Sequence, residues 1–151
     1  MQKELVIEIV NKLFIAVDNR DWDMVERIFD KTVLLDYSSM TGGEPAEFTP
    51  NQIISSWKET LPGFDSTHHQ LGNYVIELDG DKAKVFCYGT ATHYLENSSN
   101  NNLWVVVGSY ELEVEFKNNS LQIKSMKFNL KYIEGNKELP EMAQARLKEI
   151  N

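Results

Sequence analysis

The sequence contains little cysteine and few basic residues. Cys87 is the only cysteine among 151 residues, so the chain cannot form an intrachain disulfide and offers no second thiolate for a soft metal site. We therefore expect a reducing, cytoplasmic environment. Lysine and arginine together number 15 against 23 aspartates and glutamates, and the formal net charge is −8. This charge opposes binding to nucleic-acid backbones and to anionic membranes, so we expect neither as a partner.

A long apolar run is also missing. The richest run, residues 103–107, has the length of a strand and falls well short of the roughly 20 apolar residues that span a bilayer. The N-terminal residues carry charges within an amphipathic pattern, unlike a signal peptide. What the chain does have is 42% hydrophobic and 11% aromatic residues, enough for one core, and a length typical of one domain. We predict a single soluble domain over residues 1–151.

The first sixty residues carry mainly helical patterns. Apolar residues recur every three or four positions over 5–17, which predicts a helix packed on one face. A polar turn at 18–21 separates it from a second, short helix over 22–29. Residues 49–52, Thr-Pro-Asn-Gln, combine a capping box with proline at the first helical position, so a third helix carrying Trp57 begins there.

The pattern changes to period two in the second half of the chain, which is typical of strands. We expect strands over residues 68–78, 82–94, 103–116 and 121–133, joined largely by hairpins, and an earlier strand over 33–37. Helices followed by long hairpin-linked strands predict an α+β fold in which a strongly curved, mostly antiparallel sheet wraps the helices on one face. Because a helix cannot fill the concave side of such a sheet, we expect a pocket there.

Strand parity indicates which side chains face that pocket. The alternate residues of strand 82–94 are small and apolar until His93, although such a row could equally make room for a docked helix. The acidic residues of strand 103–116 form a solvated face, which sends Tyr110 inward. Parity does not choose between His68 and His69. The expected lining residues are Phe14, Val17, Trp57, Leu71, Asn73, Ala91, Tyr110, Leu112 and Phe128.

Four polar residues are candidates for chemistry in the pocket. Asp18 ends the apolar stripe of the first helix, where a carboxylate either shapes the turn or places an acid in the core, and the residues alone favour the turn. His69 and His93 each have an ordinary alternative as hydrogen-bonded core histidines. Tyr37 shares parity with apolar neighbours, so its hydroxyl lies near the cavity. Together, one aspartate and two histidines would supply an oriented general base and a general acid near neutral pH.

The stretches 17–22, 35–37, 67–69 and 91–93, which read VDNRDW, LDY, THH and ATH, resemble the SnoaL-like branch of the nuclear transport factor 2-like superfamily. The fold of that superfamily is a cone-shaped α+β barrel with a mixed sheet. Within the branch, the pattern is most similar to the scytalone dehydratases, which are cofactor-free lyases. Their pocket holds an aspartate, two histidines and tyrosines that position a water.

The resemblance implies roles for four residues. Asp18 matches the aspartate and His69 the histidine paired with it, while His93 matches the second histidine and Tyr37 a water-holding tyrosine. The match is incomplete, because Val17 replaces the other tyrosine. Tyr110 and Leu112 likewise replace a serine and an asparagine of a later strand. The dehydratase substrate is therefore not carried over. The resemblance also implies that no metal or other cofactor is needed and that the protein forms a homodimer or homotrimer.

Three functional hypotheses follow. In the first, the protein is a lyase or isomerase acting on a small hydrophobic or aromatic carbonyl compound. Asp18 orients His69, which removes a proton from the carbon next to the carbonyl. His93, or a water held by Tyr37, then protonates the departing hydroxyl or the enolate oxygen. In the second, the same pocket belongs to a non-catalytic small-ligand-binding or oligomerisation module. In the third, the aspartate and the two histidines form a metal triad.

Overall fold

A six-stranded sheet is the central element of the computed structural model, which describes residues 1–150. The strand order is β2-β1-β6-β5-β4-β3, and every neighbouring pair is antiparallel except β1 and β6. The strands are β1 (Phe29–Asp36), β2 (Ala46–Phe48), β3 (Ser66–Asp79), β4 (Lys82–Tyr94), β5 (Leu103–Lys117) and β6 (Ser120–Gly135). The sheet is therefore mixed and mostly antiparallel, as predicted, and it is an open curved sheet with β2 and β3 at its edges.

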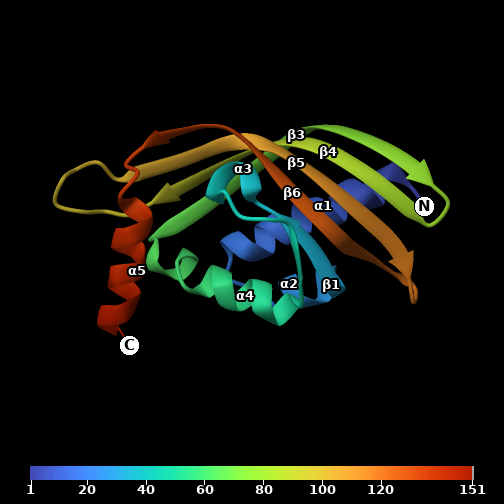
Figure 1. The fold of residues 1–151 in the computed structure, drawn as a ribbon, viewed down its shortest axis with the longest axis horizontal. Helices are drawn as coiled ribbons and strands as arrows, with labels where there is room; N and C mark the ends of the chain where they lie inside the picture. Colours follow the sequence, from blue (N-terminus) through green and yellow to red (C-terminus); the bar gives the residue numbers. More distant parts are fainter. Residues whose placement is uncertain (151) are drawn as a thin grey trace.

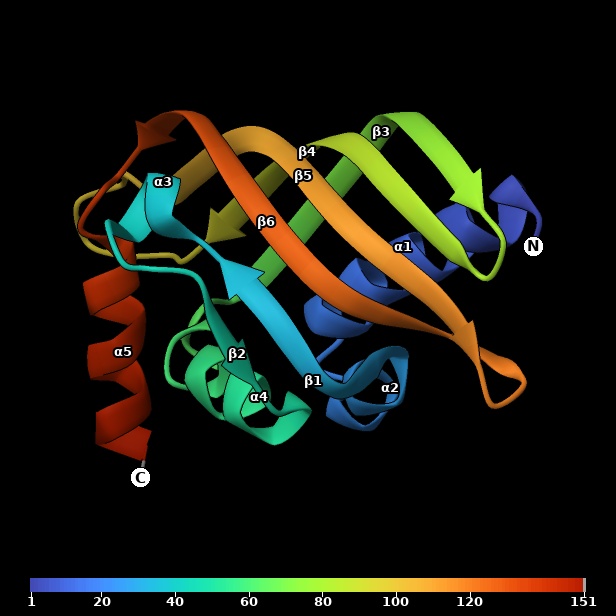
Figure 2. The ribbon, with the colours of Figure 1, turned by 45° about the vertical axis from the view of Figure 1, so that its right-hand side comes forward.

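The helices lie mainly on one side of this sheet (Figure 1). They are α1 (Lys3–Asp18), α2 (Trp22–Ile28), α3 (Ser38–Thr41), α4 (Pro50–Lys58), the short 3-10 helix η1 (Leu61–Gly63) and α5 (Leu139–Ile150). Figure 2 shows the sheet curving over α1, α2 and α4, with α5 standing at one end of the molecule. The predicted α+β fold, a curved sheet wrapped around N-terminal helices, is confirmed. None of the helices within residues 1–150 is long and apolar enough to cross a membrane.

Local sequence signals explain where the helices begin. The Thr49 hydroxyl accepts a hydrogen bond from the Gln52 backbone N–H, and the Gln52 side chain accepts one from the Thr49 backbone N–H. This is a complete capping box, followed by Pro50 at a position where a missing N–H costs nothing. The side chain of Asp21 caps α2 by accepting from the Met24 N–H at 3.1 Å.

The core lies between α1 and the inner face of the long strands. The apolar stripe of α1 is buried, and small or branched side chains of β4, β5 and β6 are buried opposite it. The α1 residues are Val6, Val10, Leu13, Phe14 and Val17, and the strand residues include Val85, Leu112, Val114 and Met126. A smaller cluster of Phe64, Leu95, Leu139 and Ala143 packs beneath α5. The period of the apolar residues thus correctly predicted the buried face of most of α1, although Leu5 at its start is 48% exposed.

Two irregularities overturn part of the parity prediction. In β3 the register shifts between Gly72 and Val75, and Asn73 adopts a left-handed conformation with φ 56°. The shift exchanges the two faces of the strand, so Val75 is 60% exposed whereas Ile76 is buried. A second shift, in the pairing of β5 with β6, leaves Tyr132 52% exposed instead of inside. A bulge reverses the side-chain alternation beyond it, which the sequence pattern does not reveal.

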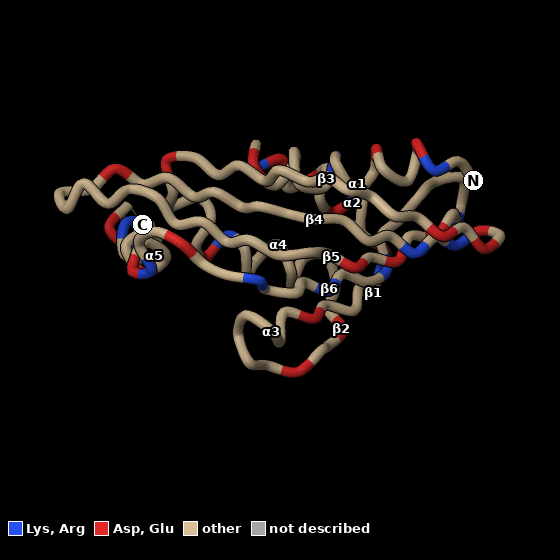
Figure 3. Tube along the Cα trace, turned by 90° about the horizontal axis from the view of Figure 1, so that it is seen from above, with Lys and Arg blue, Asp and Glu red and all other residues tan. Residues whose placement is uncertain are grey.

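The outer face of the sheet carries charges of both signs. Glu77 and Glu113 lie opposite Lys84 across the two ladders of β4, and Glu111 lies opposite Lys127 of β6. Figure 3 shows acidic and basic positions interleaved toward the end of the sheet near the N-terminus. The acidic row predicted from β5 alone is therefore matched by lysines on neighbouring strands, an arrangement that stabilises a sheet.

Gly63 allows α5 to dock against η1. A Cβ atom added at Gly63 would lie 2.1 Å from the backbone oxygen of Ala143. Because the obstacle is helix backbone, we predict that Gly63→Ala lowers the free energy of unfolding by about 1–3 kcal/mol, the usual cost of overpacking. Urea denaturation of the full chain measures this. Gly72→Ala is the control, since a Cβ there meets nothing within 4 Å; equal stability of both variants would contradict the docking argument.

Candidate active site

A cavity of about 640 Å³ lies between the helices and the inner face of the sheet. Its walls are mostly aliphatic and aromatic, with a few polar side chains, as is usual for sites that hold small organic molecules. The predicted residues that line it are Phe14, Val17, Tyr37, Trp57, His69, Ala91, His93, Tyr110 and Phe128. The structure thus brings together residues that come from α1, α4, the end of β1 and all four long strands.

Asp18 and His69 form a close pair at one side of this cavity. Oδ1 of Asp18 lies 2.7 Å from Nδ1 of His69, and Oδ2 accepts the His69 backbone N–H at 2.8 Å. The Thr67 hydroxyl donates to Oδ1 at 2.9 Å. Burial acts to raise the pKa of Asp18, but the hydrogen bonds and charge of His69, with help from Thr67, bring that pKa below its usual value. Asp18 is therefore a carboxylate that accepts hydrogen bonds.

The turn after α1 holds this carboxylate in place. Arg20 has a left-handed backbone with φ 59°. Its N–H donates to the Val17 carbonyl, and the next N–H, of Asp21, donates to the Ala16 carbonyl. Helix α1 therefore ends in a Schellman motif. The Arg20 guanidinium donates to the Thr67 hydroxyl at 2.8 Å and to the Leu61 carbonyl at 2.6 Å. A chain of hydrogen bonds thus runs from Arg20 through Thr67 to Asp18, so Asp18 both ends a turn and faces the core.

The pairing fixes which nitrogen of His69 carries the proton. Since the carboxylate of Asp18 can only accept, Nδ1 of the neutral imidazole donates to it and Nε2 keeps its lone pair. The ring lines the cavity and packs at 5.1 Å from the ring of Phe14. An imidazole held by a carboxylate on one nitrogen, with a lone pair on the other, has the arrangement of a general base.

His93 has a different environment from His69. Its Nδ1 lies 3.1 Å from the Trp104 carbonyl oxygen, which only accepts, so Nδ1 carries the proton. Its ring packs against Phe64 and Trp104 at centroid distances of 4.9 and 4.4 Å. Burial, which outweighs the Trp104 hydrogen bond, lowers the pKa of His93 to about 4. At neutral pH His93 is uncharged with Nε2 as an acceptor, so the expectation that it acts as a general acid needs correction.

The structure places four predicted residues elsewhere. Asp18 is not itself part of the cavity wall and lies behind His69. Leu71 does not line the cavity, and Asn73 is exposed in the β3 bulge. Leu112 is buried in the core and borders a different hollow, on the outer face of the sheet. For Asn73 the physical reason is the register shift, whereas Leu112 lies in the buried core between Val85 of β4 and Met126 of β6, farther along β5 than the cavity residue Tyr110.

Several wall residues were not predicted. Trp104 and Val106 share the inward parity of Tyr110 on β5, so the alternation used for Tyr110 would have identified them. Others come from the α3–β2 segment and from α5; they include Met40, Phe48, Pro140 and Gln144. These positions carry no local signal, because only the tertiary fold brings them to the cavity.

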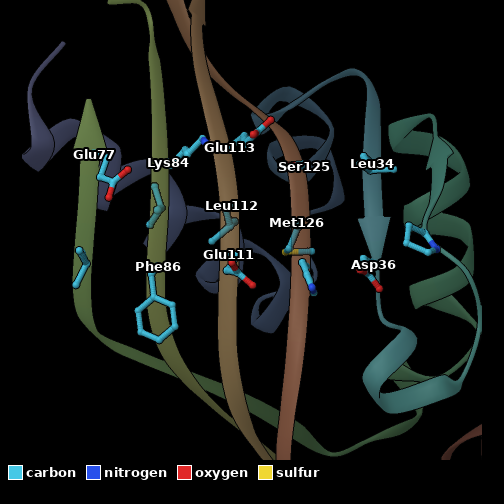
Figure 4. Close-up of a pocket in the computed structure, with 14 residues that line it drawn as sticks. Leu34, Asp36, Glu77, Lys84, Phe86, Glu111, Leu112, Glu113, Ser125 and Met126 are labelled. Atoms are coloured by element: carbon cyan, nitrogen blue, oxygen red, sulfur yellow. The ribbon is translucent and has the colours of Figure 1, made fainter. Parts of the chain in front are cut away.

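The outer hollow, of about 480 Å³, has a different character. Figure 4 shows it on the strand face turned away from α1 and α2, with Glu77, Lys84, Glu111 and Glu113 standing on neighbouring strands. Its charged groups come mostly in opposite-sign pairs, and no histidine lines it. Within residues 1–150, no three His, Cys, Asp or Glu side chains cluster closely enough to hold a metal ion. The inner cavity is therefore the candidate active site.

Comparison with known proteins places the chain in a family. The SnoaL-like domain matches residues 2–127, so the chain belongs to the SnoaL-like domain family, and the resemblance seen in the sequence is confirmed. An uncharacterised protein of Mycobacterium tuberculosis is 32% identical over 76 residues, which are 48% of this chain and 49% of that protein. The chain thus matches about half the length of the curated relatives.

Solved structures share the fold across most of the chain. The Kfla4162 protein of Kribbella flavida superposes with a TM-score of 0.85 at 22% identity, covering 94% of this chain and 96% of that one. A Novosphingobium aromaticivorans protein, provisionally named a scytalone dehydratase, gives a TM-score of 0.73 at 12% identity, with 89% and 87% covered. A Streptomyces avermitilis protein, provisionally named a dehydratase of the NTF2-like family, gives a TM-score of 0.71 at 11% identity, with 85% of this chain and 96% of that one covered. At these identities the likeness establishes the fold alone.

The buried state of His93 predicts a pH-dependent stability. The unfolded chain binds a proton at this histidine below pH 6.5, whereas the folded chain does so only below about pH 4. Stability therefore falls as the pH is lowered from 6.5 to about 4, by on the order of 3 kcal/mol from this 4%-exposed group. Urea unfolding across this range should show a shallower dependence for His93→Gln than for the wild type. The exposed His68→Gln is the control, and equal slopes for wild type and His93→Gln would refute the assignment.

Proposed function

We propose that the protein is a cofactor-independent lyase or isomerase acting on a small, largely apolar or aromatic carbonyl compound. The observation that carries this proposal is the Asp18–His69 pair: a carboxylate accepts Nδ1–H at 2.7 Å while the ring borders a mostly apolar cavity of about 640 Å³. A general base facing an apolar pocket is suited to removing a proton from carbon, because the pocket excludes competing water.

The reaction begins with proton transfer to His69. Nε2 takes a proton from the carbon next to the carbonyl, and the electron pair of that C–H bond moves onto the carbonyl oxygen to give an enolate. Asp18 stabilises the resulting imidazolium through its hydrogen bond to Nδ1. In an isomerisation the imidazolium returns the proton to a different carbon. In an elimination the enolate expels a leaving group from the adjacent carbon, and the imidazolium protonates that group.

His93 has a supporting role in this proposal. As a neutral ring with Nδ1–H bonded to the Trp104 carbonyl, it offers Nε2 as an acceptor for a substrate hydroxyl or a water. His69 then serves first as base and afterwards as acid, so the chemistry needs no second titrating group. Tyr37, whose hydroxyl pKa is raised by burial, remains a neutral hydrogen-bond donor.

A second candidate is a non-catalytic binder of the same class of ligand. The neutral state of His93 favours it, since the histidine expected to be the acid holds no proton on Nε2 at neutral pH. In a binder, both histidines would only exchange hydrogen bonds with the ligand. The two candidates differ in whether His69 moves a proton.

Hydrogen–deuterium exchange at carbon separates the two candidates. A panel of small aromatic ketones is incubated with the protein in D₂O, and loss of the proton signal next to the carbonyl is followed by NMR. We expect catalysed exchange with the wild type and a loss of at least about 100-fold in His69→Gln and in Asp18→Asn, because each removes part of the base. His68→Gln, at the exposed neighbouring histidine, should keep the wild-type rate.

The outcome that contradicts the catalytic proposal is equally definite. If the wild type binds the ketones but exchanges their protons no faster than His69→Gln does, the catalytic proposal is wrong and the protein is a non-catalytic binder. Circular dichroism and thermal melting of each variant establish that the fold is retained, so that a loss of exchange reports on chemistry.

We further propose that two or three chains associate through the outer face of the sheet. Tyr88 and Tyr132 are 44% and 52% exposed there, and Lys131 lies over the Tyr88 ring at 4.8 Å, which makes an amphipathic patch suited to a protein contact. Light scattering should give two or three times the 17.4 kDa chain mass for the wild type and the chain mass for Tyr88→Glu. Leu5→Glu, at a similarly exposed site on α1, is the control; a wild type of 17.4 kDa would refute the proposal.

A further inference from the structure

We infer that the Tyr110 hydroxyl, together with that of Tyr37, binds the carbonyl oxygen of the substrate, and that the substrate is therefore a neutral carbonyl compound and not a carboxylate. This inference rests on the proposed function for the identity of the base. It adds a positioning residue, a binding site for one oxygen atom, and a restriction on the charge of the ligand.

The Tyr110 hydroxyl is placed for a ligand atom. Tyr110 is 5% exposed and lines the cavity, yet its hydroxyl makes no hydrogen bond to any residue within 1–150. Every fully buried side-chain nitrogen or oxygen of the described residues has a partner, so this hydroxyl must be the part of Tyr110 that opens onto the cavity. Because the hydroxyl is accessible from the cavity and has no protein partner among these residues, it is free to donate a hydrogen bond to an oxygen acceptor of a bound molecule.

Packing leaves the Tyr110 ring a single position. Phe14 and Phe128 lie against it at centroid distances of 4.8 and 4.9 Å. On a third side is Gly89, where an added Cβ would come within 2.4 Å of the ring carbon Cε2. The ring therefore fits only because residue 89 has no side chain, and its hydroxyl is aimed by surrounding groups that cannot easily move.

The aromatic rings also relate Tyr110 to the base. Phe14 contacts both His69 and Tyr110, and Phe128 contacts both Tyr110 and Tyr37, the last pair stacked at 6.0 Å. The rings of His69, Phe14, Tyr110, Phe128 and Tyr37 thus contact one another in that order along the cavity, with the imidazole at one end of the series. Burial, followed by the effect of Tyr37, raises the pKa of Tyr110, which is consistent with two phenols near each other and keeps Tyr110 a neutral donor.

The charges around the cavity select the ligand. Among the described residues that line it, none is lysine or arginine, and Glu44 is acidic. A carboxylate would enter without a cation to pair with, which is costly in an apolar site. A ketone or aldehyde oxygen needs only hydrogen-bond donors, and the two phenols become more effective donors as that oxygen gains charge in the enolate.

A pair of matched ligands tests the inference without requiring turnover. Acetophenone and α-methylstyrene have nearly the same shape, but only acetophenone has an oxygen acceptor. Calorimetric titration should show tighter binding of acetophenone to the wild type and no binding of benzoate. Tyr110→Phe should weaken acetophenone about three- to tenfold, the value of one neutral hydrogen bond, and leave α-methylstyrene within about twofold. The carbonyl stretch of bound acetophenone should move to higher frequency in this variant.

Tyr132→Phe, on the outer face, is the matched control and should bind both ligands as the wild type does. An equal loss of both ligands in Tyr110→Phe would assign Tyr110 to packing alone and overturn the inference. So would an unchanged acetophenone affinity, or a wild type that does not prefer the ketone. His69→Gln should retain the ketone preference while losing proton exchange, so failure of the catalytic proposal and failure of this inference give different results.

Discussion

The contact between the end of α1 and the start of β3 is the constraint on which the site depends. The Asp18 carboxylate receives three hydrogen bonds from β3, two from His69 and one from Thr67. A carboxylate at this depth is tolerable only when it is fully hydrogen-bonded, so the helix end and the strand position each other. Arg20 holds the other side of the arrangement by bonding both Thr67 and the Leu61 carbonyl. The same contact that joins helix to sheet therefore orients the imidazole.

The two histidines show how environment separates identical side chains. His69 donates to a carboxylate, whereas His93 donates to a backbone carbonyl among aromatic rings, where burial lowers the pKa of His93 to about 4. Their ring centroids are 6.2 Å apart, so a charge on one also disfavours a charge on the other. One cavity thus holds two imidazoles whose Nδ1–H groups have different partners, a carboxylate for His69 and a backbone carbonyl for His93.

The cavity itself is kept open by the shapes of the residues around it. Large rings such as Phe14 and Tyr110 stand on the walls, while Gly89 and Ala91 on β4 make room for them. α5, docked through Gly63, and the α3–β2 segment cover the remaining sides. The same apolar core continues beneath α1, where Val6, Val10, Val85 and Val114 are buried.

The sequence by itself determined the elements and much of the inner surface. Capping residues and periodicity depend on neighbours in the chain, so α1, α2, α4, the four long strands and the inward direction of Ala91 and Tyr110 followed from local rules. Only the tertiary structure decided that Asn73 lies in a bulge, that Arg20 supports Asp18, and which nitrogen of each histidine carries the proton. The physical reason is that register shifts and hydrogen bonds between distant residues depend on partners that become neighbours only when the chain folds.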